Sequence, residues 1–114
     1  MDDLKQATCV PCRGGVPPLT AAEIAELRPH APAWNVVERD GILRLERAFA
    51  FKDFRAALDF TVEVGELAER EQHHPDIHLV SYKKVIIELF THAIEGLSEN
   101  DFIVAAKINS IWSS

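Results

Sequence analysis

The spacing of apolar residues changes along the chain, and these changes constrain the fold more than any other feature. Over residues 34–51 apolar and polar residues alternate, and Asp40-Gly41 in the middle favours a tight hairpin turn. From Asp53 the apolar residues recur every three or four positions to about His73, which predicts a helix of about five turns lying across a sheet. Both periods in one chain predict an α+β protein.

A second alternating region and two further helices complete the pattern. Residues 78–82 and 85–92 have the character of a second pair of strands. Capping boxes at Thr20–Glu23 and Ser98–Asp101 predict helices that begin there, and the last helix reaches about Trp112. The expected order is α-β-β-α-β-β-α, in a single domain with a four-stranded antiparallel sheet and helices packed on one face.

Size and charge narrow the classes of protein that remain. The 114 residues fit one domain, and we expect an extended N-terminal tail over residues 1–19 and the folded domain over 20–114. A net charge of −6 opposes binding to nucleic acid, which depends on Lys and Arg. No apolar run approaches the ~18 residues of a membrane helix, and the acidic start lacks the features of a secretory signal. We therefore expect a cytoplasmic protein with neither a nucleic-acid nor a membrane partner.

The two cysteines, Cys9 and Cys12, form one C-V-P-C pair near the N-terminus. A structural zinc site normally needs four ligands, and the chain has no second pair of this kind. A redox pair usually lies where a strand meets a helix, which is not expected here. We interpret both as free thiols, with a metal or redox role as the alternative.

Three of the five histidines fall within the stretch EQHHPDIH, at His73, His74 and His78. Their spacing is not the i, i+4 spacing of H-E-x-x-H, so a metal site is the weaker interpretation, and a solvated helix end is the simplest one. If the helix reaches His73, Glu69 lies one turn earlier and would orient that imidazole. With His92 from a strand end, the imidazoles could share one cleft and exchange protons near neutral pH.

Four motifs lie along the second half of the chain: E-x-x-x-H-H-P at Glu69–Pro75, Lys84-Val85, Thr91-His92 and G-L-S-x-x-D at Gly96–Asp101. Together these motifs resemble the pterin-4a-carbinolamine dehydratase family. The resemblance extends from about Leu19 to Trp112. H-H-P alone is a weak signal, but its combination with the later motifs is specific.

The resemblance implies a function and a site. Family members dehydrate 4a-hydroxytetrahydropterin (4a-hydroxytetrahydrobiopterin) to quinonoid dihydropterin and water, which recycles the pterin of aromatic amino acid hydroxylation. They need no metal or organic cofactor and form homodimers or homotetramers. By resemblance His73 and His92 are the proposed general acids and His74 binds substrate. The substrate site is further assigned to Glu69, Pro75 and Asp101.

Two rival functions remain open from the sequence. In animals this fold also serves as a dimerisation cofactor of a transcription factor, so a non-catalytic binding module is the alternative to an enzyme. A zinc-dependent hydrolase using the same histidines is the weaker rival.

The chain departs from animal members of the family at two positions beside the motifs. Animal members carry an acidic residue where this chain has Gln72, and arginine where it has Asn100. The natural pterin and the choice between dimer and tetramer are not encoded in any readable motif.

Overall fold

A computed structural model of the protein describes residues 4–7, 9 and 17–113. In chain order its elements are the 3-10 turn η1 (Leu4–Gln6), α1 (Ala21–Leu27), η2 (Arg28–His30), β1 (Asn35–Arg39), β2 (Ile42–Ala50), α2 (Phe54–Glu71), β3 (Asp76–Val80), β4 (Lys84–Leu89), η3 (His92–Ile94) and α3 (Glu99–Ser113). The helix α1 begins at the predicted capping box, since the Glu23 N–H donates to Thr20 Oγ1 and the Thr20 N–H to Glu23 Oε1.

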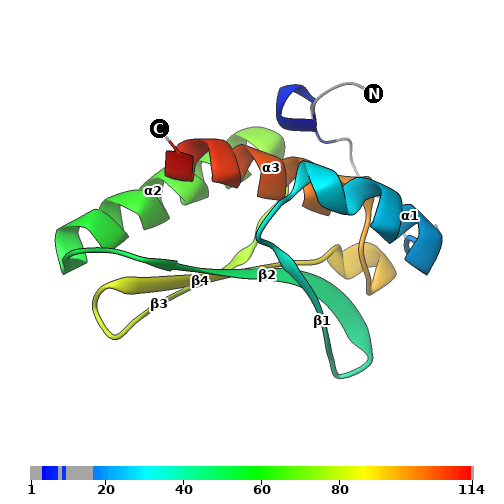
Figure 1. The fold of residues 1–114 in the computed structure, drawn as a ribbon, viewed down its shortest axis with the longest axis horizontal. Helices are drawn as coiled ribbons and strands as arrows, with labels where there is room; N and C mark the ends of the chain where they lie inside the picture. Colours follow the sequence, from blue (N-terminus) through cyan, green and yellow to red (C-terminus); the bar gives the residue numbers. More distant parts are fainter. Residues whose placement is uncertain (1–3, 8, 10–16, 114) are drawn as a thin grey trace.

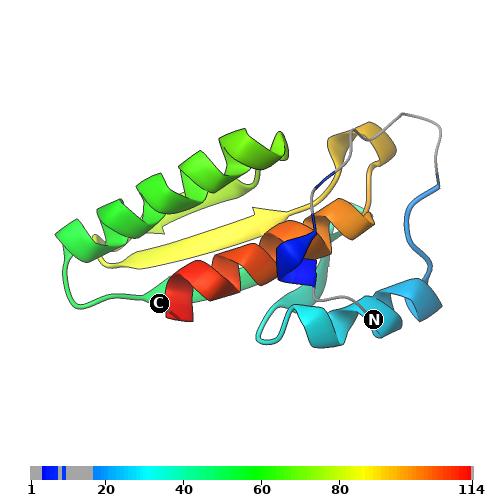
Figure 2. The same cartoon turned by 90° about the horizontal axis from the view of Figure 1, so that it is seen from above.

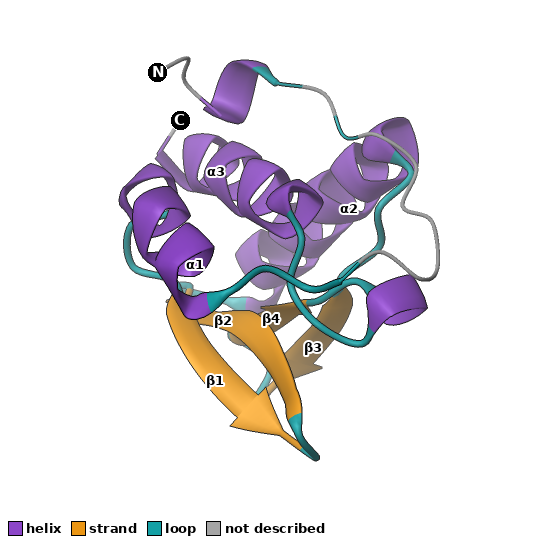
Figure 3. Ribbon diagram, turned by 90° about the vertical axis from the view of Figure 1, so that its right-hand side faces the viewer, coloured by secondary structure: helices purple, strands orange, loops and turns teal. Residues whose placement is uncertain are grey.

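The three α-helices lie together on one side of a four-stranded sheet (Figures 1 and 3). All neighbouring strands are antiparallel, and their order across the sheet is β1-β2-β4-β3. Seen from above, α2 and α3 run side by side along the sheet (Figure 2). The predicted α+β architecture and order of elements are confirmed. None of the helices in the described ranges is both long and apolar enough to cross a membrane.

The two hairpin turns use backbone conformations with positive φ. Asp40 and Gly41 have φ values of 55° and 79°, as the Asp-Gly pair predicts. In the second hairpin Ser81 and Tyr82 take values of 49° and 51°, so they belong to the turn rather than to the strand predicted over 78–82. The strand β3 instead begins two residues earlier, directly after Pro75, which places the H-H-P motif at the edge of the sheet.

The strand β2 is central in the sheet, although Arg47 interrupts its apolar pattern. It pairs with β1 on one side and with β4 on the other. Arg47 stays beneath the helices because its Nη1 donates to Asn109 Oδ1 at 2.5 Å and its guanidinium lies 4.5 Å over the Phe49 ring. Burial lowers the pKa of Arg47, but a guanidinium remains charged at neutral pH.

The core fills the space between the sheet and the helices α2 and α3. Its fully buried apolar side chains come from both layers: Leu45, Phe49, Val64, Val85, Ile87, Leu89, Phe102, Val104 and Ile108. Burying one such side chain contributes about 1.5–3 kcal/mol. The packed layers therefore fix the end of α2 relative to the end of β4, which is where the H-H-P and T-H motifs lie.

Part of the N-terminal segment packs onto the helices. Residues Leu4–Gln6 form the turn η1, and Leu4 is buried in the core, so the predicted extended tail does not hold at these residues. The Cys9 N–H donates to Glu71 Oε1 at 2.9 Å, and Lys107 Nζ lies 2.9 Å from Glu71 Oε2. This segment is thereby joined to the last residue of α2. Most of the predicted tail, including Cys12, lies outside the described residues.

The thiol of Cys9 is free and half-buried. Burial, together with the nearby Glu71 carboxylate, raises the pKa of Cys9 to about 12. The thiol therefore stays protonated at neutral pH, whereas redox chemistry and metal binding use the thiolate.

Candidate active site

The site begins where α2 ends, two residues earlier than the predicted end at His73. Gln72 adopts the left-handed conformation with φ 54° and ψ 38°. The His73 N–H donates to the Ala68 carbonyl at 3.2 Å, and the Gln72 N–H donates to the Glu69 carbonyl at 3.3 Å. This is the hydrogen-bond pattern of a Schellman motif. The two histidines therefore follow a turn instead of continuing the helix.

The imidazole of His73 is held by a buried carboxylate. Its Nε2 lies 2.6 Å from Asp101 Oδ1, with exposed side-chain fractions of 11 % and 0 %. An ionised carboxylate only accepts hydrogen bonds, so Asp101 takes the Nε2–H of the ring. Nδ1 is then the nitrogen left to exchange a proton with a ligand, in the manner of a histidine oriented by an aspartate.

Asp101 is itself fixed by further donors. Its Oδ2 accepts the Thr91 hydroxyl and the Ser98 backbone N–H, each at 2.9 Å. Since the single Thr91 hydroxyl hydrogen is used on Asp101, the Ser98 hydroxyl donates to Thr91 Oγ1 at 2.7 Å. The carboxylate thus caps the start of α3, as the second capping box predicts, and also orients His73. These contacts satisfy a charge that would be costly to bury alone.

His74 has the carboxylate partner that the sequence assigned to His73. Its Nε2 lies 2.9 Å from Glu69 Oε1, and both side chains are exposed. The prediction that Glu69 orients His73 is therefore wrong. The cause is the turn at Gln72, which ends the helical spacing on which that prediction depended.

His92 comes shortly after the end of β4 and lines the same pocket as His73 and His74. It begins η3, directly after the buried Thr91, and its side chain is exposed. Its ring packs on Phe90, with centroids 4.1 Å apart and planes at 45°. Among the described residues no carboxylate contacts the His92 ring, in contrast to both other histidines.

One pocket of about 360 Å³ brings the three histidines together. Its lining consists of Gln72, His73, His74, Pro75, Asp76, Phe90, Thr91, His92 and Asn100. The volume suits a small organic ligand. Of the six predicted site residues, four line this pocket. Glu69 and Asp101 do not line it but contact His74 and His73.

The remaining histidines lie elsewhere. His78, on β3, contacts Glu88 at 2.7 Å on the other side of the sheet from the helices, and His30 belongs to η2. Within the described ranges no three His, Cys, Asp or Glu side chains are grouped as metal ligands.

Sequence reasoning did not single out Phe90, Asp76 or the pocket role of Asn100 and Gln72. Phe90 precedes His92 by two residues at a strand end, and residues two apart share a side of a strand. That spacing was the available signal. Asn100 is buried and lines the pocket one residue before Asp101.

The fold and the pocket define a class: a small α+β protein whose cavity presents three imidazoles suited to proton transfer. Within that class, the family described as Pterin 4 alpha carbinolamine dehydratase matches residues 17–111. The chain belongs to this family.

Relatives support this membership over nearly the whole chain. A protein of Gloeobacter violaceus, provisionally named pterin-4-alpha-carbinolamine dehydratase 1, is 50 % identical over 96 % of this chain and 93 % of its own length. A provisionally named pterin-4-alpha-carbinolamine dehydratase of Rubrobacter xylanophilus is 47 % identical over 97 % of this chain and all of its own.

Two solved structures share the fold. A transcriptional coactivator/pterin dehydratase from Brucella melitensis has a TM-score of 0.74 and 35 % identity, covering 82 % of this chain and 97 % of that one. A pterin dehydratase-like protein described as a RuBisCO assembly factor in the alpha-carboxysome has a TM-score of 0.60, with 72 % and 92 % covered. At 22 % identity the latter shows the fold alone.

Proposed function

We propose that the protein dehydrates 4a-hydroxytetrahydropterin, with 4a-hydroxytetrahydrobiopterin as the representative substrate, to quinonoid dihydropterin and water. The observation that carries the proposal is the pocket lined by His73, His74 and His92 in a chain of this family. The names of the relatives support dehydratase activity.

The reaction needs two proton transfers. The C4a–O bond breaks and the departing hydroxyl takes a proton to leave as water, because hydroxide is a poor leaving group. The N5 lone pair forms the new C=N bond, and N5 loses its hydrogen to a base. Positioned acids and bases typically accelerate such steps 10²–10⁴-fold. Neither step requires a metal or an organic cofactor.

His73 and His92 exchange these two protons, and His74 binds the substrate. His73 is suited to its role because Asp101 fixes its ring and leaves Nδ1 for the ligand. His92, at the start of η3, lines the same pocket. In the proposed complex the two imidazoles flank the flat bicyclic ring of the substrate. His74, held by the exposed Glu69, stands at the rim. Pro75 fixes the chain after the histidine pair.

The assembly belongs to the proposal as well. The strand order makes β1 and β3 the edges of the sheet, and the helices cover one of its faces. On α2, the apolar side chains of Phe54 and Val62 are exposed. These surfaces support a homodimer or homotetramer, which sedimentation would distinguish.

The test is a stopped-flow dehydration assay with the 4a-carbinolamine. We expect His73→Ala and His92→Ala to lower kcat about 10²–10⁴-fold and His74→Ala to act mainly on KM. His30→Ala is the matched control and should retain wild-type rates, since His30 lies outside the pocket. Wild-type rates no faster than buffer would reject the proposal and favour the alternative, a non-catalytic binding module on the same fold.

A further inference from the structure

His92 is oriented differently from the other two pocket histidines. His73 and His74 each contact a carboxylate, whereas the contact of His92 is the half-buried Phe90 ring, 4.1 Å away between centroids. A ring–ring contact of this kind is worth about 0.5–1.5 kcal/mol, but it can fix the His92 ring only if the Phe90 ring is itself held in place.

Phe90 carries a second contact that can hold it. The Arg44 Cζ atom of β2 lies 4.6 Å over the Phe90 ring centroid. The Arg44 side chain is only 12 % exposed, and a cation over an aromatic face gains strength as water is excluded. Phe90 therefore links Arg44 on the sheet to His92 in the pocket.

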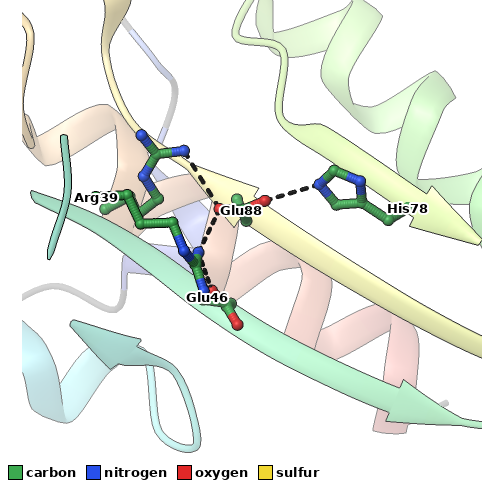
Figure 4. Close-up of polar contacts among 5 residues, drawn as sticks. Arg39, Glu46, His78 and Glu88 are labelled. Carbon is green, nitrogen blue, oxygen red and sulfur yellow. Dashed lines mark hydrogen bonds and ion pairs between the residues drawn. The ribbon is translucent and has the colours of Figure 1, made fainter. Parts of the chain in front are cut away.

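Arg44 is held by Glu88, two residues before Phe90. Its Nη1 lies 3.3 Å from Glu88 Oε1, which also accepts from Arg39 at 2.6 Å, while His78 contacts Oε2 at 2.7 Å. Figure 4 shows Glu88 between His78 on one side and Arg39 with Glu46 on the other. Burial alone would raise the pKa of Glu88, but His78 and the two arginines together lower it. Glu88 is thus a fixed anion at neutral pH.

Arg44 keeps this position despite an unmet hydrogen bond. Its Nε is buried with no hydrogen-bond partner among the described residues. A buried donor without a partner is costly, and such a group in a folded protein calls for a reason. The contact of the Arg44 guanidinium with the Phe90 ring supplies one.

We infer that Arg44 and Phe90 are positioning residues for His92, with Glu88 holding Arg44 in place. Arg44 never touches the pocket and acts through Phe90. This inference rests on the proposed function for its catalytic consequence, but its structural part concerns the His92 ring alone.

The experiment compares Arg44→Met, which keeps the apolar stem, with Arg39→Met as the matched control. Both remove an arginine from Glu88, but only Arg44 lies over Phe90. The side-chain NMR signals of His92 should shift and broaden in Arg44→Met and in Phe90→Leu, and stay in place in Arg39→Met. Phe90→Tyr keeps the aromatic ring and should therefore leave the His92 signals close to those of the wild type.

In the dehydration assay Arg44→Met should lower kcat about tenfold with KM nearly constant. That loss should disappear in a His92→Ala background, because the positioned group is then absent. Unchanged His92 signals in Arg44→Met, or an equal loss in the His92→Ala background, would overturn the inference. Shifted signals in a protein without dehydratase activity would instead overturn the proposed function and leave the positioning role standing.

Discussion

Two consecutive histidines contact carboxylates in opposite environments. His73 lies 2.6 Å from Asp101, with exposed fractions of 11 % and 0 %, whereas His74 lies 2.9 Å from Glu69, with 58 % and 73 %. The distances are similar, but solvent screens only the second pair. Burial rather than distance therefore decides how much each pair contributes to stability and to the orientation of its ring.

A third carboxylate falls between these extremes. Glu71, 10 % exposed, receives the Cys9 N–H and Lys107, whose own side chain is 19 % exposed. It is nearly as buried as the first pair, but one of its partners reaches solvent. Graded substitutions at the three carboxylates test whether burial sets the size of the effect.

The largest effect is expected for Asp101→Asn. Asparagine presents an NH₂ group where the carboxylate accepts, so at least one of the donors from His73, Thr91 and Ser98 is left without an acceptor. We expect a loss of about 3 kcal/mol in the free energy of unfolding, measured in urea, and of about 10²-fold in kcat.

The matched control for that substitution is Asp76→Asn, at an exposed aspartate that lines the same pocket. Its free energy of unfolding should stay within about 0.5 kcal/mol of wild type. Equal destabilisation by the two substitutions would contradict the role given to burial.

An intermediate effect is expected for Glu71→Gln, and it should depend on pH. Burial alone would raise the pKa of Glu71, but the Cys9 N–H and Lys107 outweigh it and lower that pKa. A lowered folded pKa means stability that is present above the unfolded value of about 4.3 and is lost as the pH falls through the folded pKa.

At pH 7 the Glu71→Gln variant should be less stable than wild type by about 1 kcal/mol. Unfolding curves recorded from pH 7 to pH 3 should show this difference shrinking below about pH 4. A difference that stays constant over the whole range would mean that the charge of Glu71 does not matter.

The smallest effect is expected for Glu69→Gln. An exposed ion pair is worth about 0–1 kcal/mol, so thermal unfolding should change little. We expect kcat/KM to fall less than about tenfold, and salt near 0.5 M to remove most of the difference by screening. A rise in KM of a hundredfold or more would show instead that Glu69 contacts the substrate directly.

The sequence predicted the fold well because its signals are local. The change of period at Asp53, the capping box at Thr20 and the Asp40-Gly41 turn each act within a few residues, and each is present in the structure. The order of the strands across the sheet was not predicted, because it depends on the pairing of β2 with β4, about forty residues on, and no local pattern encodes that pairing.

The shared cleft was predicted better than the contacts within it. The spacing of His73, His74 and His92 pointed to a shared cleft, and all three line one pocket. Glu69 was assigned to His73 instead of His74, because a helix was expected to continue where Gln72 turns left-handed, a conformation more usual for glycine or asparagine. The contact between His73 and Asp101 spans 28 residues of sequence and follows from tertiary packing alone.

Gln72 and Asn100, the positions that depart from animal members of the family, both line the pocket. Neither is among the residues proposed to move protons. Under the proposed function, the departures therefore bear on the fit of the substrate more than on the reaction type.

The left-handed turn at Gln72 has a consequence for sequence drift. An exposed helix end usually tolerates almost any replacement, but a positive φ is strained for every residue with a side chain and most of all for β-branched ones. Valine or isoleucine at this solvent-facing position would press the backbone back toward the right-handed region and swing both neighbouring imidazoles away from their partners. Selection on this surface residue would thus act through backbone geometry, in addition to the hydrogen bond that its side chain donates to the Glu69 carbonyl at 2.7 Å.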